Sequence, residues 1–421
     1  MTVLIAGAGI AGLTLGLTLH QIGVPFRIYE AVRQVRPLGV GINLQPTAVR
    51  ELIDLGLGDM LDRVGLRTQD YGFYTKTGQE IWSEPRGLAA GYRWPQYSVH
   101  RGQLQVALYK AVKQRAGCDV IKPGQRVSGF RHADGAAVLR VETAAGPSEI
   151  AGNLVIAADG IHSAIRKQMY PDEGAPIWGG AILWRGTTQA KPFLSGASMV
   201  LAGHDRQRIV AYPISRPDPD TGLATLNWIA ERRVDPSQGW RREDWNRAAD
   251  LTEVLPYFEE WVFDWLDVPA MIRGADKIYE YPMVDRDPID RWTEGRVSLI
   301  GDAAHPTYPV GSNGASQAIV DARILGAKLL EHGATGQALT AYEAEIRPVV
   351  NKVVLANRGS GPDAILQIVE DRCGGVFGQI EDVISRRDLA DHAAKYKRLA
   401  GLDIEALNAR APTIAAARRG K

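Results

Sequence analysis

Three short segments, far apart in the chain, combine glycine with residue types that can bind a phosphorylated cofactor. They are Gly7-Ala8-Gly9-Ile10-Ala11-Gly12 near the start, Ala158-Asp159-Gly160 in the middle, and Gly301-Asp302-Ala303-Ala304-His305-Pro306 in the last third. Glycine lets the backbone approach a phosphate closely, and a carboxylate accepts hydrogen bonds from sugar hydroxyls. Each segment alone is weak evidence, whereas all three in this order are specific.

The first segment lies in the context that a dinucleotide-binding turn requires. An apolar run over 3–6 predicts a buried strand, 13–20 predicts the helix after it, and 26–29 predicts a second strand that ends at Glu30. The order strand, glycine turn, helix, strand, acid is the fingerprint of dinucleotide binding. A glycine-rich turn without a ligand is the alternative, and the complete order argues against it.

Each residue of this turn has a distinct predicted role. Gly7 permits the tight turn, Gly9 lets the backbone approach a pyrophosphate, and Gly12 lets the helix pack closely on the strand. The start of the helix, around Ala11, presents free N–H groups and a positive dipole to the phosphates. Glu30 can accept hydrogen bonds from both hydroxyls of an adenosine ribose. This segment alone does not separate FAD from NAD.

The middle and late segments also follow predicted strands. Residues 153–158 form an apolar run that ends at Asp159-Gly160, and 296–300 form another that ends at Gly301-Asp302. An acid and a glycine at these points would also suit an ordinary tight turn. Taken alone, the middle segment therefore leaves a turn and a ligand contact equally open.

The late segment continues into a loop and a second helix. Pro309-Val310-Gly311-Ser312-Asn313-Gly314 precedes a helix predicted from 315 to about 330. The start of this helix directs N–H groups and a positive dipole at whatever lies before Gly311. His305-Pro306 is equally well explained as a rigid turn.

Together the three segments resemble the flavin-contacting motifs of the class A flavoprotein monooxygenases, which are single-component aromatic hydroxylases. The resemblance runs from the N-terminus to about Arg358. The family's usual late motif has Gly-Gln-Gly followed by an Asn, whereas this chain has Gly311-Ser312-Asn313-Gly314-Ala315-Ser316-Gln317. This departure resembles one subfamily, the 5-methylphenazine-1-carboxylate monooxygenases, as do the segments 36–43, 82–87, 211–215 and 281–288.

The resemblance implies FAD as the cofactor and assigns further residues to it. Arg101 would reach the phosphate or ribityl region, with an exposed helix-start arginine as the alternative. Asp302 would accept a hydrogen bond from the ribityl chain, and Asp159 with Gly160 would contact the cofactor at the middle motif. A helix start favours the negative charge of a reduced flavin by about 0.3–1 kcal/mol; the residues implied there are Gly311, Ser312, Asn313 and Gly314.

The resemblance also implies a reaction. NAD(P)H reduces FAD, and with O2 a flavin hydroperoxide transfers OH to a small aromatic or heteroaromatic ring, such as a salicylate- or phenazine-like acid. We find no second strand–glycine–helix–acid unit, so NADH or NADPH is expected to visit the same cleft transiently. The candidate catalytic residues are Pro309, His305 and Tyr308, of which the last two are weak candidates for a general base.

Two other functions stay open at this point. One is a flavin oxidase or reductase that inserts no oxygen, and the other is a flavin-loaded protein that sequesters aromatic molecules. A pure binding protein is disfavoured, because it needs no helix dipole directed at a reduced flavin.

The chain between the motifs indicates a second, antiparallel sheet. Residues 182–186, 208–213 and 224–229 are predicted strands, and 71–74 with 79–82 form a predicted hairpin in the same sheet. The family places substrate contacts on such a sheet. Core packing is the alternative for each predicted contact, and the residues are Trp184, Tyr212 and Met283.

The predicted fold class is α/β: a Rossmann-like FAD-binding domain of mixed or parallel sheet and helices, with an inserted antiparallel-sheet substrate domain and a C-terminal helical segment. The predicted FAD-binding domain comprises 1–70, 98–175 and 285–360, the substrate domain comprises 71–97 and 176–284, and the helical segment and tail comprise 361–421. The last segment carries no recognised motif.

The composition excludes several classes of partner. With 49 basic and 48 acidic residues the net charge is +1, so neither a nucleic acid nor a membrane is expected as a partner. No apolar stretch approaches the ~20 residues that span a bilayer. Cys118 and Cys373 are too few for a disulfide framework or a metal site, and they suit a cytoplasmic protein. The quaternary state is open, with a homodimer as one option.

Overall fold

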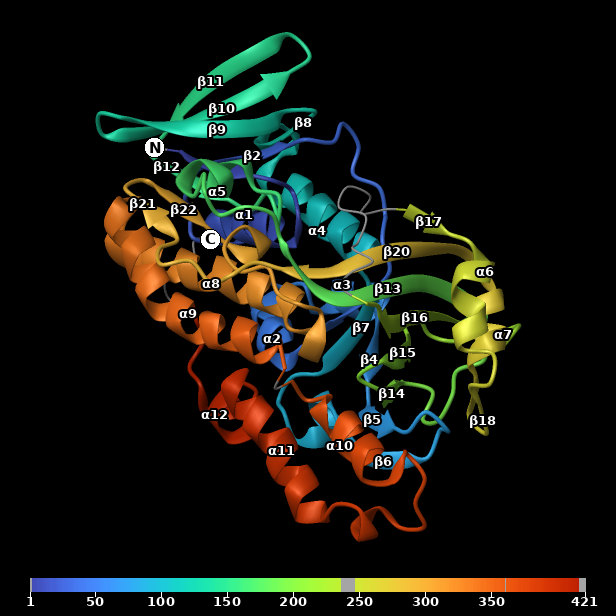
Figure 1. The fold of residues 1–421 in the computed structure, drawn as a ribbon. Coiled ribbons are helices and arrows are strands. Elements are labelled where there is room, and N and C mark those ends of the chain that lie inside the picture. Colours follow the sequence, from blue (N-terminus) through green and yellow to red (C-terminus); the bar gives the residue numbers. More distant parts are fainter. Residues whose placement is uncertain (1, 236–246, 360, 416–421) are drawn as a thin grey trace.

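A six-stranded sheet forms the base of the nucleotide-binding part (Figure 1). The structure is a computed structural model and describes residues 2–235, 247–359 and 361–415. The strand order is β21-β22-β12-β1-β2-β8, and neighbours run parallel except for the β21–β22 pair. The strands are β1 (Val3–Ala6), β2 (Phe26–Glu30), β8 (Ile121–Pro123), β12 (Leu154–Ala157), β21 (Thr293–Glu294) and β22 (Val297–Leu299).

Both faces of this sheet are covered, which explains why its strands are continuous apolar runs. On one face lie α1 (Ile10–Gln21), α4 (Arg101–Ala116), α8 (Gly314–His332) and α9 (Gly336–Ala356). The other face packs against α5 (Ala164–Met169) and the antiparallel strands β9 (Arg126–Ala133), β10 (Ala136–Thr143) and β11 (Gly146–Gly152). Nearby lie α2 (Pro46–Asp54), α3 (Gly58–Val64) and a small sheet of β3 (Gly41–Leu44), β7 (Gln96–His100) and β4 (Gly65–Thr68).

The second large sheet has eight strands in the order β17-β20-β13-β16-β15-β14-β5-β6, antiparallel except for β14 with β5. The predicted strands and hairpin within it are confirmed, and β14, β17 and β20 are additional. The strands are β5 (Asp70–Tyr74), β6 (Glu80–Pro85), β13 (Ile177–Ala190), β14 (Ser198–His204), β15 (Gln207–Pro213), β16 (Ala224–Arg233), β17 (Arg247–Ala249) and β20 (Ala275–Asp285).

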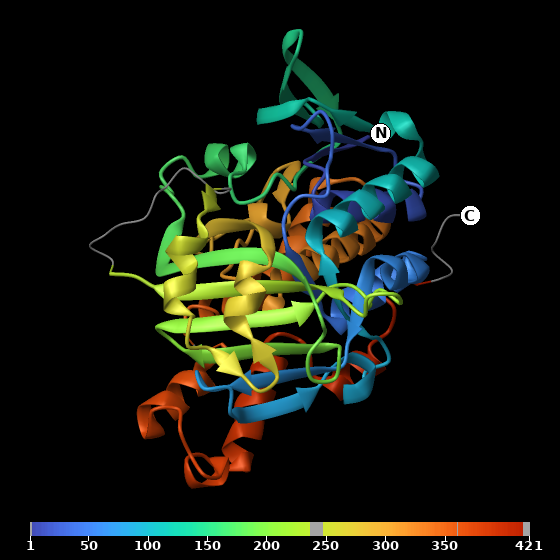
Figure 2. The same cartoon turned by 90° about the vertical axis from the view of Figure 1, so that its right-hand side faces the viewer.

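One face of the eight-stranded sheet is covered by short helices and strands that pack on it. Figure 2 shows the short helices α6 (Leu251–Val254) and α7 (Val268–Arg273) crossing this face. With β18 (Val262–Phe263) and β19 (Leu266–Asp267), they bury an aromatic cluster against the strands. The opposite face is directed towards the nucleotide-binding part. The predicted fold class is confirmed.

The C-terminal segment is helical, as predicted, and packs beside the edge of the same sheet. It contains α10 (Ala364–Cys373), α11 (Arg386–Leu399) and α12 (Ile404–Ala409). Figure 1 shows α10 beside β6, with α11 and α12 farther to the left. Ile365, Val369 and Leu389 join an apolar cluster with Tyr71 and Phe73 of β5. Burial of these side chains supplies the hydrophobic stabilisation that fixes the segment on the sheet.

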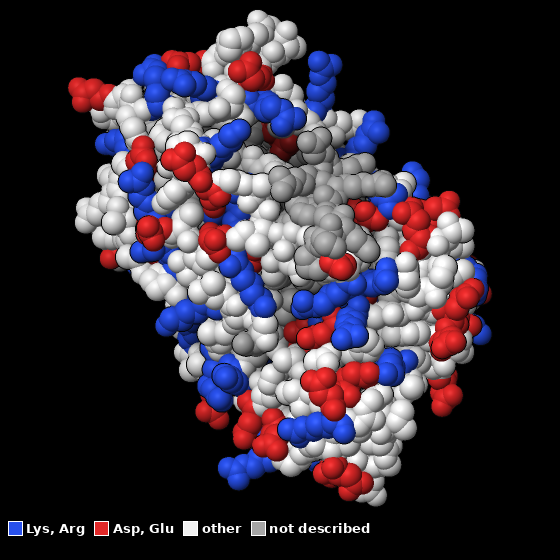
Figure 3. All heavy atoms as spheres, viewed as in Figure 1, with Lys and Arg blue, Asp and Glu red and all other residues white. Residues whose placement is uncertain are grey.

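The surface has no large region of a single charge on the face that Figure 3 shows. Basic and acidic side chains are interspersed over this face. Across the ranges 2–235, 247–359 and 361–415, no helix is both long and apolar enough to cross a membrane.

Candidate active site

A cavity of about 330 Å³ lies where the two large sheets face each other. Its wall is formed by the glycine turn before α1, the end of β12, the loop before α8 and one face of the eight-stranded sheet. The structure thus brings together most of the predicted site residues. Those that line the cavity are Gly9, Ala11, Arg101, Gly160, Tyr212, Met283, Asp302, Tyr308, Pro309, Gly311, Ser312, Asn313 and Gly314.

The glycines of the first and middle motifs divide into two kinds. A Cβ at Gly7 would lie 2.5 Å from the Ala158 carbonyl oxygen, and one at Gly12 would lie 2.1 Å from the Gly7 carbonyl oxygen. A Cβ at Gly9 would meet nothing closer than the Ala158 carbonyl oxygen at 3.9 Å, and one at Gly160 would meet nothing within 4 Å. Gly7 and Gly12 therefore close the turn, whereas Gly9 and Gly160 leave open space on the cavity wall. A side chain would fill this space, so the turn fits a closely approaching pyrophosphate.

Two helices begin at the cavity without a side-chain cap. The N-cap of α1 is Gly9, which has no side chain, and that of α8 is Asn313, whose side chain accepts no hydrogen bond from its helix. Both N-cap residues line the cavity. The first N–H groups of a helix have no partner within it, and the helix dipole adds positive potential there. Both helix starts are therefore suited to anionic groups of a cofactor.

Two of the predicted carboxylates are tied to the backbone and do not line the cavity. The Glu30 carboxylate accepts hydrogen bonds from Ala8 N at 2.7 Å and Val32 N at 2.9 Å, which fixes the glycine turn. Asp159 Oδ2 accepts one from Ala164 N at 3.0 Å, while Oδ1 is buried without a partner among the described residues. Burial raises the pKa of Asp159. The ribose contact of Glu30 and the cofactor contact of Asp159 stay predictions.

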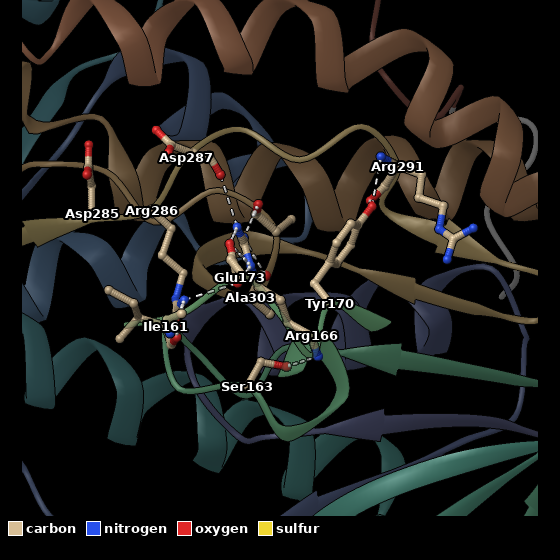
Figure 4. A network of polar contacts seen from close by, with 12 residues as sticks. Ile161, Ser163, Arg166, Tyr170, Glu173, Asp285, Arg286, Asp287, Arg291 and Ala303 are labelled. Atoms are coloured by element: carbon tan, nitrogen blue, oxygen red, sulfur yellow. Dashed lines mark hydrogen bonds and ion pairs between the residues drawn. The ribbon is translucent and has the colours of Figure 1, made fainter. Parts of the chain in front are cut away.

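A buried arginine ties the middle and late motifs together (Figure 4). Arg166 of α5 donates from Nη1 to the Ala303 and Ala304 carbonyl oxygens, at 3.1 and 2.7 Å. Its charge is balanced by Glu173, which also pairs with Arg286 at 3.0 Å. Hydrogen bonds from a charged donor to buried carbonyls are strong and costly to remove. Sequence reasoning missed Arg166, although it lies in the helix just after the middle motif.

His305 lies behind the late motif, where it contacts Asp321 of α8, and it does not line the cavity. Its Nε2 lies 2.6 Å from Asp321 Oδ2 in α8, and the same oxygen accepts a hydrogen bond from Gly301 N at 2.9 Å. The ring packs on Trp292, with 5.2 Å between centroids. Burial lowers the pKa of His305, but the Asp321 carboxylate outweighs this, so the net shift is upward. This position differs from the predicted catalytic one, because the ring is enclosed by protein.

Tyr308 lies on the cavity wall and is held by a buried carboxylate. Burial, with Asp285 beside it, raises the pKa of the Tyr308 phenol to about 12. Arg358 fixes Asp285 through Nε at 2.7 Å and Nη2 at 3.0 Å. A phenol with such a pKa stays protonated at neutral pH and acts as a hydrogen-bond donor, not as a general base. Pro309, the next residue, is exposed to the cavity.

The alternation of side chains along β13 decides which residues face the cavity. Leu183 and Arg185 line it, whereas Trp184 lies between them on the opposite face. Trp184 stacks on Tyr257 with 5.9 Å between ring centroids, and its Nε1 donates to Glu280 at 3.3 Å. The structure therefore corrects the predicted substrate contact of Trp184, because its ring belongs to the core behind the sheet.

Arg185 is the cavity residue that sequence reasoning missed most plainly. Its Nη2 donates to the Gly41 carbonyl oxygen at 3.2 Å, and its guanidinium lies 5.8 Å from the Tyr281 ring centroid. The Nε atom is buried without a partner among the described residues, and burial lowers the Arg185 pKa. On the next strand, Asn227 accepts a hydrogen bond from Gly41 N at 2.6 Å. The sheet thus holds Gly41 at both backbone groups.

The remaining sheet residues form an apolar surface with one charged group at its end. The apolar residues on the wall are Leu183, Met199, Leu201, Val210, Tyr212, Ile229 and Met283. At the end, Arg208 forms ion pairs with Glu231, at 2.7 Å, and with Asp363 from the C-terminal segment. Such a surface can enclose a flat apolar ring.

Comparison with known proteins places this geometry in a family. The sequence model of one family, described as an FAD binding domain, matches residues 1–248 and 273–357. The chain is 44% identical over 362 residues to phenazine 1,6-dicarboxylic acid hydroxylase PhzS of Lysobacter antibioticus, covering 85% of this chain and 89% of that protein. It is 33% identical to aurachin C monooxygenase/isomerase of Stigmatella aurantiaca, over 82% of this chain and 84% of that protein.

Solved structures share the fold. The structure of Klebsiella pneumoniae HpxO complexed with FAD and uric acid matches with a TM-score of 0.70 and 24% identity, covering 95% of this chain and 93% of that chain. CtdE in complex with FAD and a substrate matches with a TM-score of 0.71 and 19% identity, covering 96% and 99%. With the glycine turn, the two uncapped helix starts and the family match, FAD is the cofactor. The chain belongs to the family of single-component FAD-dependent aromatic monooxygenases.

Proposed function

We propose that this protein hydroxylates a planar aromatic acid of the phenazine carboxylic type, with NADH or NADPH as the transient electron donor. The similarity to a phenazine dicarboxylic acid hydroxylase supports a fused, carboxylated ring. The apolar surface on the cavity wall supports an aromatic ring system. The observation that carries the proposal is that Arg185 lines the cavity without a carboxylate partner among the described residues.

Arg185 brings a positive charge to the cavity that no carboxylate of the described chain neutralises. Its neighbours are the Tyr212 and Tyr281 phenols, and Arg101 adds further positive charge. A guanidinium that is partly removed from water without a countercharge is costly, and a substrate carboxylate would offset this cost on binding. The planar guanidinium fork matches a carboxylate in shape as well as in charge. A carboxylated ring is therefore favoured over its uncharged parent.

The proposed division of labour follows from the elements that line the cavity. The residues proposed to hold FAD are Gly9, Ala11, Arg101, Gly160, Asp302, Gly311, Ser312, Asn313 and Gly314. When bound, FAD supplies electron transfer from NAD(P)H and the activation of O2. Arg185 orients the acid, the apolar face of the sheet excludes water, and Tyr308, held by Asp285, forms the wall beside the ring.

The test compares two neighbouring substitutions on opposite faces of β13. Arg185→Gln removes the charge on the cavity wall, and Trp184→Phe serves as the matched control behind the sheet. Ligand affinity is read from the flavin absorbance change with phenazine-1-carboxylate and with uncharged phenazine.

A hydrogen bond to a charged group contributes about 1.5–3 kcal/mol, so Arg185→Gln should weaken acid binding roughly 10- to 100-fold. Phenazine binding should change little, and Trp184→Phe should bind both ligands as the wild type does. Equal losses for the acid and for phenazine in Arg185→Gln would refute the carboxylate contact. Product mass completes the test: a gain of one oxygen is expected, and peroxide without an oxygenated product from every aromatic acid tried would refute hydroxylation.

A further inference from the structure

We infer that Tyr396, from the C-terminal helix α11, is a positioning residue for the flavin-facing loop, defined here as residues 307–314. The match to the family model ends at residue 357, so Tyr396 lies outside the matched region. The inference rests on the proposed contact of this loop with the flavin. It gives the C-terminal segment a role in the site.

One hydroxyl group holds the flavin-facing loop near both of its ends. Asn313 Nδ2 donates to the Tyr396 hydroxyl at 2.8 Å, and this hydroxyl donates to Asn357 Oδ1 at 3.0 Å. Asn357 Nδ2 in turn donates to Thr307 Oγ1 at 2.9 Å. Tyr396 is 6% exposed, so water does not readily replace these hydrogen bonds.

The loop between these contacts has a backbone that needs support from outside. Gly311 has a φ of +69° and Ser312 a φ of +55°, and the left-handed region is unfavourable for a serine. Such conformations persist where the surrounding structure imposes them. A Cβ at Gly311 would lie 1.9 Å from the Tyr396 hydroxyl oxygen, so the ring packs directly against this backbone. Tyr396 therefore fixes the loop by contact as well as by hydrogen bonding.

Helix α11 is itself anchored to the body of the protein. Lys397 pairs with Glu84 at 2.6 Å, and Glu84 also pairs with Arg86 at 2.6 Å. The Tyr92 hydroxyl donates to the Leu402 carbonyl oxygen just after the helix. Tyr396 is thus presented by a fixed element. Since Gly311, Ser312 and Asn313 line the cavity, a shift of α11 would alter the cofactor side of the site.

The test uses two tyrosine-to-phenylalanine substitutions that each remove one buried hydroxyl from the interface with the C-terminal segment. Tyr396→Phe breaks the hydrogen bonds to the loop, and Tyr92→Phe is the matched control, because its hydroxyl contacts Leu402 and no loop residue. FAD affinity is measured from the recovery of flavin fluorescence on dilution, with the melting temperature measured alongside.

Tyr396→Phe should bind FAD about tenfold more weakly, a change of about 1.4 kcal/mol, and Tyr92→Phe should bind it as the wild type does. The flavin absorbance bands should also shift in Tyr396→Phe alone. If both variants lose similar stability and both keep the wild-type FAD affinity, Tyr396 is merely structural and the inference is overturned.

Hydrogen exchange of residues 307–316 separates this inference from the proposed function. In the wild type, adding FAD should slow exchange in these residues, and in Tyr396→Phe without FAD exchange there should be faster than in Tyr92→Phe. No protection by FAD would overturn the assigned flavin contact. Protection by FAD together with wild-type exchange in Tyr396→Phe would overturn the role of Tyr396 alone.

Discussion

Gly9→Ala should weaken FAD binding, whereas Gly12→Ala should destabilise the apoprotein, although both substitutions add one methyl group to the same turn. Gly9 has φ −75° and ψ −175°, which alanine adopts readily, and its Cβ would lie 3.9 Å from the nearest atom. At Gly12 the Cβ would lie 2.1 Å from the Gly7 carbonyl oxygen and 3.3 Å from Ile5 Cγ2. The first methyl group therefore points into the cavity and the second into the protein.

The magnitudes follow from these distances. Alanine is a poorer N-cap residue than glycine, but it also lowers the conformational entropy of the unfolded chain. These two effects oppose each other, so Gly9→Ala should change the free energy of unfolding of the apoprotein by less than about 1 kcal/mol. It should displace the pyrophosphate from at least one backbone N–H, which is worth about 1.5–3 kcal/mol, or roughly 10- to 100-fold in FAD affinity. Gly12→Ala forces backbone atoms apart and should destabilise the apoprotein by about 1–3 kcal/mol or more.

The assay measures two quantities on each variant. Urea denaturation of the apoprotein gives the change in stability, and quenching of flavin fluorescence gives the FAD dissociation constant. The assigned roles would be refuted by wild-type FAD affinity in Gly9→Ala, or by wild-type apoprotein stability in Gly12→Ala. A matched loss of both quantities in both variants would show that the turn acts as one unit.

Three other substitutions test single contacts. Asp302→Ala removes an exposed carboxylate from the cavity wall and should weaken FAD binding about tenfold, by the loss of a charged hydrogen bond; unchanged affinity in the fluorescence titration would contradict its role. Glu30→Ala should weaken FAD binding less, and a larger loss than in Asp302→Ala would contradict this order. The pKa of His305 is raised above 6.5, so the stability from its pair with Asp321 is fully present below about pH 6.5 and is lost as the pH rises through the folded-state pKa. His305→Asn should therefore flatten the fall in melting temperature as the pH rises above about 6.5, and parallel profiles would refute the pair.

The nucleotide-binding part could be predicted because its signals are local. Continuous apolar runs such as 3–6 and 154–157 form the parallel strands, and the glycines and acids directly follow them. A covered parallel sheet needs such runs, and a turn that approaches a phosphate needs glycine. Each residue there is specified by its immediate neighbours, so its position follows once the strand is identified.

The sheet that forms the substrate wall could be predicted only in outline. Successive side chains of a strand point to opposite faces, so a residue's face depends on the exact register of the strand. Trp184 and Arg185 are adjacent, and a shift of one residue exchanges the cavity face for the core face. Aromatic type favoured Trp184, yet alternation places Leu183 and Arg185 together on the other face. Met283 and Tyr212 line the cavity wall, and their contact with substrate stays a prediction. Arg208 and Glu231, paired across β15 and β16, gave no sign of their contact in the sequence.

The role of Tyr396 lies beyond local sequence signals altogether, because its partners Asn313 and Asn357 are brought to it by the packing of α11. The two sides of the cavity are formed by different kinds of element, and this has a functional consequence. The cofactor side of the cavity is built from turns and helix starts, and the ring side is built from the face of a sheet. Substitutions on β13 or β15 should therefore alter ligand affinity while FAD stays bound. Those at Gly9 or in the flavin-facing loop should release FAD first, and a new ring specificity is accordingly expected to arise on the sheet.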